Sequence, residues 1–433
     1  MLCRNFIHQR NSLDIGKFLF LIGVFFLPTA LPIAGIFLLF SLFISFYKMK
    51  FSFLKEKVNL SIILLIGLIL FSTTNNLIYQ VPEEIKDLNY NHLWLNLFNW
   101  IPSLLCFIAC QNYLKNIKDR LDFSKYFIAG TIPVIASCLF QLFFDNSGPF
   151  EIFNGLIIWF QKPIEETGGI SGLFSNRNYA GIWLAVSLPF ALYFFKKNLN
   201  SKINSVITLS INFLVIYLII ATNSRSAFLG MISTIILYLG FKSLLLMFLL
   251  IIFFMFINTI LPIINSNTFS LLPNIFERFE NIFFINSDRI VIFRSAINFI
   301  LERPFLGWGV GTFYFIYTNK ENMWNPPFLY FEPQHTHNLF LEMAFNFGIP
   351  IAIFVTSLSI LLLIRAIPIS FSKRQFSLDK AWFCATLVVF IMHINDVTFY
   401  DGKIGLLASI LFSGLKCLTF SQEDANTLFY RNS

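Results

Sequence analysis

Long apolar runs recur along most of the chain and constrain its fold more than any other feature. A transmembrane helix needs roughly 17–25 predominantly apolar residues, and the sequence supplies such runs repeatedly. The composition agrees, since 56% of the residues are hydrophobic and only 12% are charged, whereas soluble domains carry about 25% charged residues. The sequence therefore predicts an all-α polytopic integral membrane protein rather than a soluble enzyme.

Twelve of these runs are predicted to be membrane-spanning helices. They cover residues 17–29, 31–47, 58–74, 94–114, 123–144, 178–195, 203–221, 226–240, 242–262, 338–364, 381–398 and 403–420. The first two are short and are joined between Pro28 and Pro32, so they form either a tight hairpin or one broken element. The whole chain, residues 1–433, is expected to be a single membrane domain.

Basic residues alternate between successive connections. Lysine and arginine gather after the second, fourth, sixth and tenth expected spans, and such residues mark the cytoplasmic side of a membrane protein. Both termini are therefore expected in the cytoplasm. The net charge of +8 then reflects topology, and we expect no nucleic-acid partner.

The longest connection on the expected outer side covers residues 263–337 and is too long for a plain loop. Within it, residues 288–301 have apolar side chains at helical spacing, which predicts an amphipathic helix. The expected apolar face consists of Ile290, Phe293, Ile297 and Ile300, widened by Ile292 and Phe299. Pro304 ends this helix, because proline disfavours helical geometry in the residue before it.

Arginines occur repeatedly on the expected outer face, close to hydrocarbon. Charges there are costly and tend to be functional or paired, and a guanidinium binds phosphate oxygens in a bidentate manner. Arg225 and one of Arg289 and Arg294 are candidate anion ligands, and Arg177 is a weaker candidate. The alternative for each is an anchor to lipid headgroups or a salt bridge.

The segment Gly307-Trp308-Gly309-Val310-Gly311 is rich in glycine but does not fit a dinucleotide fingerprint. That fingerprint requires a preceding strand and a following helix in a βαβ unit, and neither is expected here. A tight turn, or flexible backbone close to a polar substrate, is the expected use of these glycines.

His335 and His337 lie where the outer loop meets an apolar helix that begins near Asn338. Imidazole titrates close to neutral pH and suits proton transfer. A closed zinc site would need more ligands than these two histidines and the adjacent Glu332 provide. We therefore expect no metal and no cofactor.

These segments, in this order, resemble the O-antigen ligase and polymerase superfamily of bacterial envelope proteins. The resemblance covers residues 170–365 and rests on five pieces. They are Gly172-Leu173-Phe174-Ser175-Asn176-Arg177-Asn178, Ser224-Arg225-Ser226, Asp288-Arg289 through Arg294, Arg303-Pro304-Phe305-Leu306-Gly307-Trp308-Gly309-Val310-Gly311 and His335-Thr336-His337-Asn338-Leu339-Phe340-Leu341-Glu342. The ligases share a signature of His, then Asn, Ser or Gln, nine residues, Gly, two more residues, and finally Gly, Thr or Tyr. His337, Asn338 and Gly348 fit this signature, whereas Ile351 departs from it at the last position.

The resemblance implies a membrane glycosyltransferase with a GT-C-like fold, independent of metal and inverting in stereochemistry. Its donor would be a glycan on undecaprenyl diphosphate, and its acceptor a sugar of lipid A-core or another glycan. His337 would activate the acceptor hydroxyl, while Arg225 and either Arg289 or Arg294 would hold the diphosphate. Arg177, His335, Asn338 and Arg303 would contact substrate, on the periplasmic face of the bacterial inner membrane among its lipids.

Two alternatives stay open. A repeat-unit polymerase of O-antigen or exopolysaccharide would use the same leaving group as a ligase. A solute transporter, for example of bicarbonate, belongs to another class, but transporters place ionisable residues near the membrane midplane. The oligomeric state is not predicted.

Overall fold

The computed structural model describes residues 2–79, 91–241, 243, 245, 288–324, 333–371 and 377–431. Within these residues the chain is almost entirely helical. Its one sheet there is a two-stranded antiparallel hairpin of β1 (Phe150–Ile152) and β2 (Ile157–Trp159). The predicted fold class, an all-α polytopic membrane protein, is confirmed.

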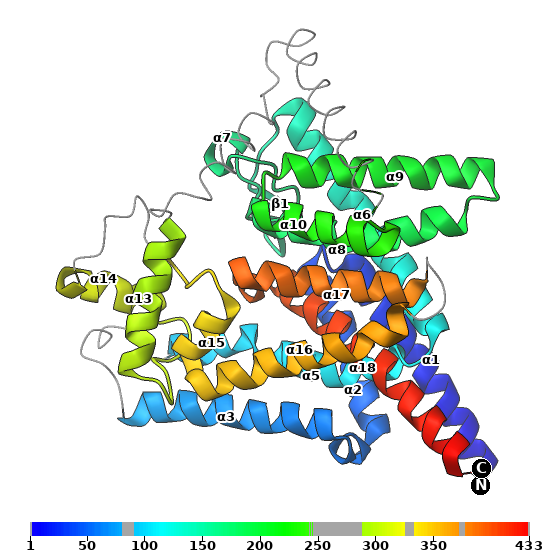
Figure 1. The fold of residues 1–433 in the computed structure, drawn as a ribbon, viewed down its shortest axis with the longest axis horizontal. Coiled ribbons are helices and arrows are strands. Elements are labelled where there is room, and N and C mark those ends of the chain that lie inside the picture. The colour runs from blue at the N-terminus through cyan, green and yellow to red at the C-terminus, as the bar shows by residue number, and fades with distance from the viewer. Residues whose placement is uncertain are drawn as a thin grey trace.

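Long helices run side by side, and shorter helices gather at one end of them, toward the left of Figure 1. The α-helices are α1 (Leu2–Phe26), α2 (Leu31–Met49), α3 (Lys57–Tyr79), α4 (Asn91–Asn96), α5 (Ile101–Ala109), α6 (Ile117–Phe144), α7 (Ile164–Thr167), α8 (Arg177–Lys197), α9 (Lys202–Ala221), α10 (Arg225–Thr234), α13 (Asp288–Glu302), α14 (Phe313–Trp324), α15 (Leu339–Phe347), α16 (Ile349–Phe371), α17 (Leu378–Asn395) and α18 (Gly402–Arg431). Short helical turns lie at Ser52–Lys55, Leu97–Asn99, Cys110–Tyr113, Ile235–Leu239 and Thr398–Tyr400.

Among the described residues, nine helical segments are long and apolar enough to cross a membrane. Eight match predicted spans directly, and the ninth, α16, matches most of the predicted span 338–364. The predicted span 17–29 falls mainly in α1, and 226–240 corresponds to the shorter apolar segment Arg225–Leu239. Apart from Ser243 and Leu245, the predicted span 242–262 lies outside the described residues.

The first two spans form a tight hairpin and not one broken element. Pro28 follows the end of α1, and Pro32 lies in the first turn of α2. A proline is tolerated there because the N–H groups of the first turn form no hydrogen bond within the helix. The turn is closed by the N–H of Ala30, which donates to the carbonyl of Phe26 at 2.8 Å. The prolines therefore end one helix and start the next.

The predicted span 338–364 is wrong as a single element, because the helix breaks at Gly348. This residue has φ +98° and separates α15 from α16. A β-carbon on Gly348 would lie 2.1 Å from the carbonyl oxygen of Phe305. The close approach of the preceding loop, which requires a glycine in the left-handed region, thus decides where the span begins.

Three helices, α8, α17 and α18, form the centre of the bundle. The buried share of their apolar windows is 72%, 67% and 78%, against 22% for α2 and 28% for α16. Aromatic rings from α6, α8 and α17 pack together there, including Phe123 against Trp382 at 4.9 Å between centroids and Phe127 against Trp183 at 5.1 Å. Residues at the ends of α8 and α17 are therefore held by the most constrained part of the fold.

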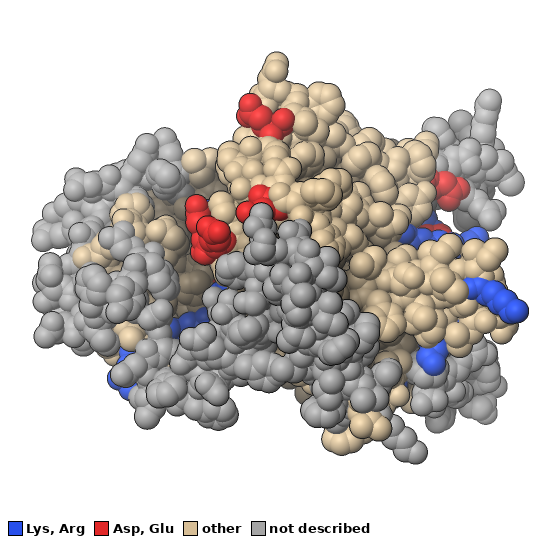
Figure 2. Space-filling view, turned by 90° about the horizontal axis from the view of Figure 1, so that it is seen from above, with Lys and Arg blue, Asp and Glu red and all other residues tan. Residues whose placement is uncertain are grey.

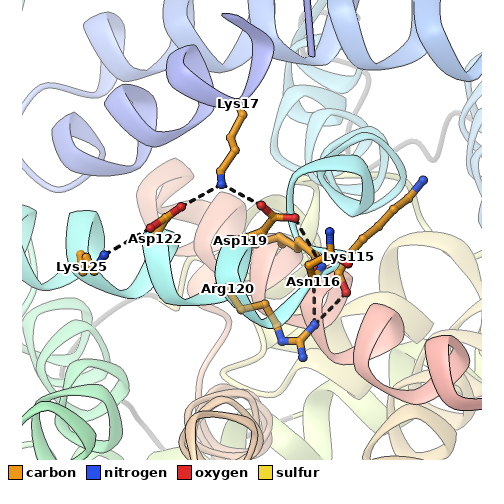
Figure 3. Close-up of polar contacts among 8 residues, drawn as sticks. Lys17, Lys115, Asn116, Asp119, Arg120, Asp122 and Lys125 are labelled. Atoms are coloured by element: carbon orange, nitrogen blue, oxygen red, sulfur yellow. Dashed lines mark hydrogen bonds and ion pairs between the residues drawn. The ribbon is translucent and has the colours of Figure 1, made fainter. Parts of the chain in front are cut away.

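Figure 3 shows a cluster of charged groups at the beginning of α6. Lys17 Nζ lies 2.7 Å from Asp119 Oδ1 and 2.8 Å from Asp122 Oδ2, which ties α1 to α6. The Arg120 guanidinium donates to the carbonyls of Leu114 and Lys115, and its Nη2 lies 2.9 Å from Asp379 Oδ1 at the start of α17. These pairs join three helices at one end of the bundle.

The opposite end of α17 leads to Asp396. An 18-residue helix is about 27 Å long, close to the hydrocarbon thickness of a bilayer, about 30 Å. The cluster of Figure 3 and the residues around Asp396 are thus separated by roughly one membrane thickness. In Figure 2 the most prominent Lys and Arg side chains lie toward the right and most Asp and Glu toward the centre and left, and smaller Lys and Arg patches also lie at the left.

Candidate functional site

The loop His335–Asn338 lies at the end of the bundle away from the cluster of Figure 3. Asn338 is the N-cap of α15, where its Oδ1 accepts from the N–H of Leu341 at 3.0 Å. Its Nδ2 donates to the carbonyl of Ile394 at 2.8 Å, which joins this loop to the end of α17. Asn338, expected to contact substrate, therefore also fixes the loop that carries both histidines.

His337 lies directly before this cap with φ +53°, a left-handed backbone conformation that is uncommon for residues other than glycine. Its N–H donates to Nδ1 of His335 at 3.3 Å, and the two rings are 4.2 Å apart between centroids. Strained backbone of this kind persists only where the surroundings hold it, and it is concentrated at functional sites.

The ring of His337 meets Asp396, which follows the last residue of α17. The distance from His337 Nδ1 to Asp396 Oδ1 is 3.2 Å, and the aspartate is only 3% exposed. Its other oxygen accepts from Nδ2 of Asn178 at 2.8 Å, and the N–H of Val397 donates to Oδ1 at 2.9 Å. Every oxygen of this buried carboxylate thus has a partner.

Asp396 is held in its charged form. Burial alone would raise the pKa of Asp396, but the hydrogen bond from His337, together with the charge of Arg289, holds that pKa well below its usual value. A carboxylate can only accept, so Nδ1 of His337 carries the ring proton and donates it. Nε2 of His337 is then left with a lone pair, as a general base requires.

His335 is positioned by an aromatic ring. It stacks on Tyr400 with 5.4 Å between centroids and 14° between planes. Burial is the main cause that lowers the pKa of His335; the charge of Arg289 acts in the same direction, and the carboxylates of Glu342 and Asp396 act against it. His335 is therefore neutral near pH 7 and does not compete for the negative charge of Asp396.

Glu342, in the first turn of α15, is completely buried and forms a hydrogen bond with the histidine loop. Its Oε2 accepts from the N–H of Thr336 at 2.9 Å, and its Oε1 accepts from Nδ2 of Asn346 at 3.0 Å and from the hydroxyl of Tyr400. One carboxylate thus connects the histidine loop, the helix α15 and the ring that stacks on His335.

We expect Glu342→Ala to lower the free energy of unfolding by about 2–4 kcal/mol, because three donors, two of them buried, lose their acceptor. Thermal unfolding of purified protein in detergent measures this effect. Glu151→Ala, at an exposed position in β1, is the control and should leave the midpoint unchanged. Equal midpoints for the two variants would show that the Glu342 contacts do not stabilise the fold.

The glycine-rich run before α8 packs against the connection between α9 and α10. The carbonyl of Gly168 accepts from Nη1 of Arg177 at 2.9 Å and from Nδ2 of Asn223 at 2.8 Å. Ser224 caps α10, and Arg225 is its first residue and half-buried. Arg177 thus supports the loop that leads to Arg225, while its neighbour Asn178 contacts Asp396.

The two arginines of α13 differ in their surroundings. Arg289 is half-buried, and its charge acts on both His335 and Asp396. Arg294 is exposed. Of the pair left open by the sequence, Arg289 therefore lies with the histidines. Arg303 packs its guanidinium over the ring of Trp308 at 4.1 Å, as a cation–π contact.

The predicted amphipathic helix 288–301 is present as α13, but its expected apolar face was partly wrong. Ile297 is 46% exposed. The buried stripe contains Ile292, Ala296 and Phe299, which follow helical spacing, and Phe299 packs on Phe345 of α15 at 6.3 Å. The residues expected only to widen the face are thus at its centre, because α13 packs on α15.

The Gly307–Gly311 segment is a tight turn that docks the loop onto α15. The N–H groups of Trp308 and Gly309 donate to the carbonyls of Phe345 and Asn346 at 2.7 and 3.1 Å, and the N–H of Ile349 donates to the carbonyl of Pro304 at 2.7 Å. Backbone therefore meets backbone between the loop and the end of α15. A β-carbon on Gly307 would lie 2.4 Å from the carbonyl oxygen of Phe345.

We expect Gly348→Ala to lower stability by about 2–4 kcal/mol, since it combines a positive φ with a backbone clash. The thermal unfolding midpoint in detergent is the measurement. Gly35→Ala is the matched control, because a β-carbon there meets nothing within 4 Å and alanine favours a helix. An unchanged midpoint for Gly348→Ala would contradict the backbone docking described above.

An apolar cavity of about 140 Å³ begins beside this loop. Its lining includes Asn338, Phe340 and His393, together with side chains of α3, α5, α16 and α18. The polar loop thus borders an apolar cavity that extends from it along the middle of α16 and α18.

Residues 210–356 match the family model described as O-antigen ligase. The match supports the O-antigen ligase superfamily. No curated protein matches the chain in a sequence comparison. Arg225, Arg289 and both histidines of the loop lie within the matched segment, which falls inside the predicted range 170–365.

Sequence reasoning missed Asp396 as the partner of His337, and it gave Asn178 no role. Both lie outside the matched segment, 59 and 159 residues from His337, if counted along the chain. The available signal was an aspartate just after a long apolar helix, at the end where the histidines were expected. Ionisable groups so close to hydrocarbon are functional candidates.

Proposed function

We propose that this protein is a ligase-type glycosyltransferase that uses a glycan on undecaprenyl diphosphate as donor. The family match supports the coarser statement, a membrane glycosyltransferase or ligase of polysaccharide synthesis. The observation that carries the finer proposal is the pair of His337 and buried Asp396, with Arg289 beside it. It combines a base with a cation suited to an anionic leaving group.

In the proposed reaction, Nε2 of His337 takes the proton from an acceptor hydroxyl. The oxygen attacks the anomeric carbon of the donor, and the bond from that carbon to the diphosphate breaks. A single displacement inverts the anomeric centre, and no metal or cofactor takes part. Arg289 and Arg225 stabilise the charge that develops on the leaving diphosphate.

The lipid character of the donor is supported by the position of the cavity beside Asn338. A polyprenyl diphosphate has an apolar chain and a charged head, and this end of the bundle offers apolar and cationic surroundings side by side. The energy for transfer arrives with the donor itself, so a site away from the cytoplasm needs no nucleotide.

The deciding experiment incubates purified protein with lipid-linked glycan and candidate acceptors, with and without a chelator. Glycan transfer that persists with chelator supports the proposal. If no acceptor led to release of polyprenyl diphosphate, and vesicles containing the protein took up labelled solute, the results would favour a transporter. Surface polysaccharide of a deletion strain separates the two transferases: loss of a ligase leaves polymer on its carrier, and loss of a polymerase leaves single repeats on the acceptor.

The proposed orientation places both termini in the cytoplasm of a bacterium and the histidine loop in the periplasm. We expect Gln334→Cys, at an exposed position beside the histidines, to react with a membrane-impermeant maleimide in intact spheroplasts. Asn200→Cys, exposed between α8 and α9, should react only after permeabilisation. The reverse pattern would place the site in the cytoplasm and remove the proposed mechanism.

A further inference from the structure

His335, His337 and Asp396 form a group that the sequence does not bring together. One ligand atom from each lies within 4.8 Å of the others. Along the sequence the two imidazoles have only Glu332 as an adjacent acid, whereas the fold brings in the carboxylate of Asp396 from the end of α17. Two imidazoles and one carboxylate are the ligand set of a common type of zinc site that keeps a fourth position open.

The distances in this group suit a small divalent ion. Zinc binds histidine nitrogen at about 2.0–2.1 Å and carboxylate oxygen at about 2.0–2.2 Å, so neighbouring ligands of a tetrahedral site lie about 3.3 Å apart. His337 Nδ1 and Asp396 Oδ1 are already 3.2 Å apart. An ion at this edge needs only a modest movement of His335.

The protein also fixes the three groups before any ion binds. Asn178 and the N–H of Val397 orient the carboxylate, and Tyr400 stacks on His335. The charge of Arg289 opposes a cation, which makes the affinity lower than that of a structural zinc site.

We propose that Zn²⁺ binds reversibly to His335, His337 and Asp396 and blocks the site as an inhibitor. An ion on Nδ1 of His337 takes the position of the ring proton, and that proton moves through solvent to Nε2. Nε2 then has no lone pair with which to accept a proton. The inhibition rests on the proposed function, whereas the binding of the ion does not.

Calorimetric titration of ZnCl₂ into purified, chelator-washed protein in detergent tests the site without any substrate. We expect one ion per chain, with affinity reduced at least tenfold in His335→Gln and unchanged in His92→Gln, which removes a histidine that is not one of the three. Arg289→Gln should bind about fivefold more tightly, because a neighbouring positive charge is removed. Equal affinity in the wild type and His335→Gln would overturn the proposal.

Cobalt provides a measurement that does not depend on a variant folding. Co²⁺ added to the wild-type protein should produce visible absorption of a tetrahedral or five-coordinate ion, and ZnCl₂ should displace it. An octahedral spectrum identical to that of Co²⁺ in buffer would overturn the site.

Transfer assays separate this inference from the proposed function. We expect ZnCl₂ to inhibit transfer at the concentration at which it binds, and a chelator to restore the rate. Binding at the site with unchanged transfer would overturn the inhibition. If no transfer occurs with any acceptor, the proposed function fails, and the titration still decides whether the ion site exists.

Discussion

His337→Ala is expected to lower the rate of glycan transfer by about 10²–10⁴-fold, the usual contribution of a general base. The ring of His337 is oriented by buried Asp396, and with the ring proton on Nδ1 its Nε2 carries the lone pair that accepts a proton. Because His337 has φ +53°, His337→Asn is the better structural match, since asparagine tolerates the left-handed region. Both variants should lose activity equally, and His335→Ala should have a smaller effect.

The measurement is the rate of transfer from lipid-linked donor to acceptor by purified protein. His92→Ala is the control for loss of a histidine and should retain the normal rate. Thermal unfolding of His337→Asn shows whether the fold is intact. A folded His337→Asn protein that transfers glycan at the wild-type rate would rule out the general-base role.

Asp396→Asn is expected to lower kcat by about 10²-fold with little change in KM for either substrate. An amide in this position has nearly the shape of the carboxylate, but it removes the charge that stabilises the imidazolium formed during transfer. It can also donate to Nδ1 of His337, which favours the tautomer with the proton on Nε2. That tautomer cannot act as the base.

Asp14→Asn makes the same chemical change at an exposed position of α1 and should leave kcat unchanged. The pKa of Asp396 lies well below its usual value, so the carboxylate stays ionised throughout an assay between about pH 6 and 8. A loss of activity on mild acidification therefore does not report protonation of Asp396. If Asp396→Asn raised KM and left kcat intact, its role would be in substrate binding and not in orienting the base.

The membrane class and most spans follow from the sequence because each depends on local composition. A run of apolar residues long enough to cross a bilayer has few other stable environments, and eight predicted spans have direct counterparts among the described residues. The helix at 288–301 was predicted for the same reason. Its apolar face was predicted wrongly at Ile297. The spacing of apolar residues in a helix does not say which neighbouring helix it packs against.

The break at Gly348 shows the same limit. The run 338–364 is apolar enough to be one span, and only the approach of Pro304 and Phe305 from a distant loop explains why the helix stops. Arg177 and Arg303 are similar cases. Both were expected to contact substrate, and the structure places the guanidinium of Arg177 on the carbonyl of Gly168 and that of Arg303 over the ring of Trp308.

The sequence by itself determined that the chain is a helical membrane protein and that His337 and several arginines are candidates for its chemistry. Only the tertiary structure joins Asp396 and Asn178 to the histidine loop, and it makes Arg289, rather than exposed Arg294, the arginine whose charge acts on that loop. The physical reason is that the hydropathy of a span depends only on the residues of that segment. A hydrogen bond between the start of α8 and the end of α17 depends on how the two helices pack.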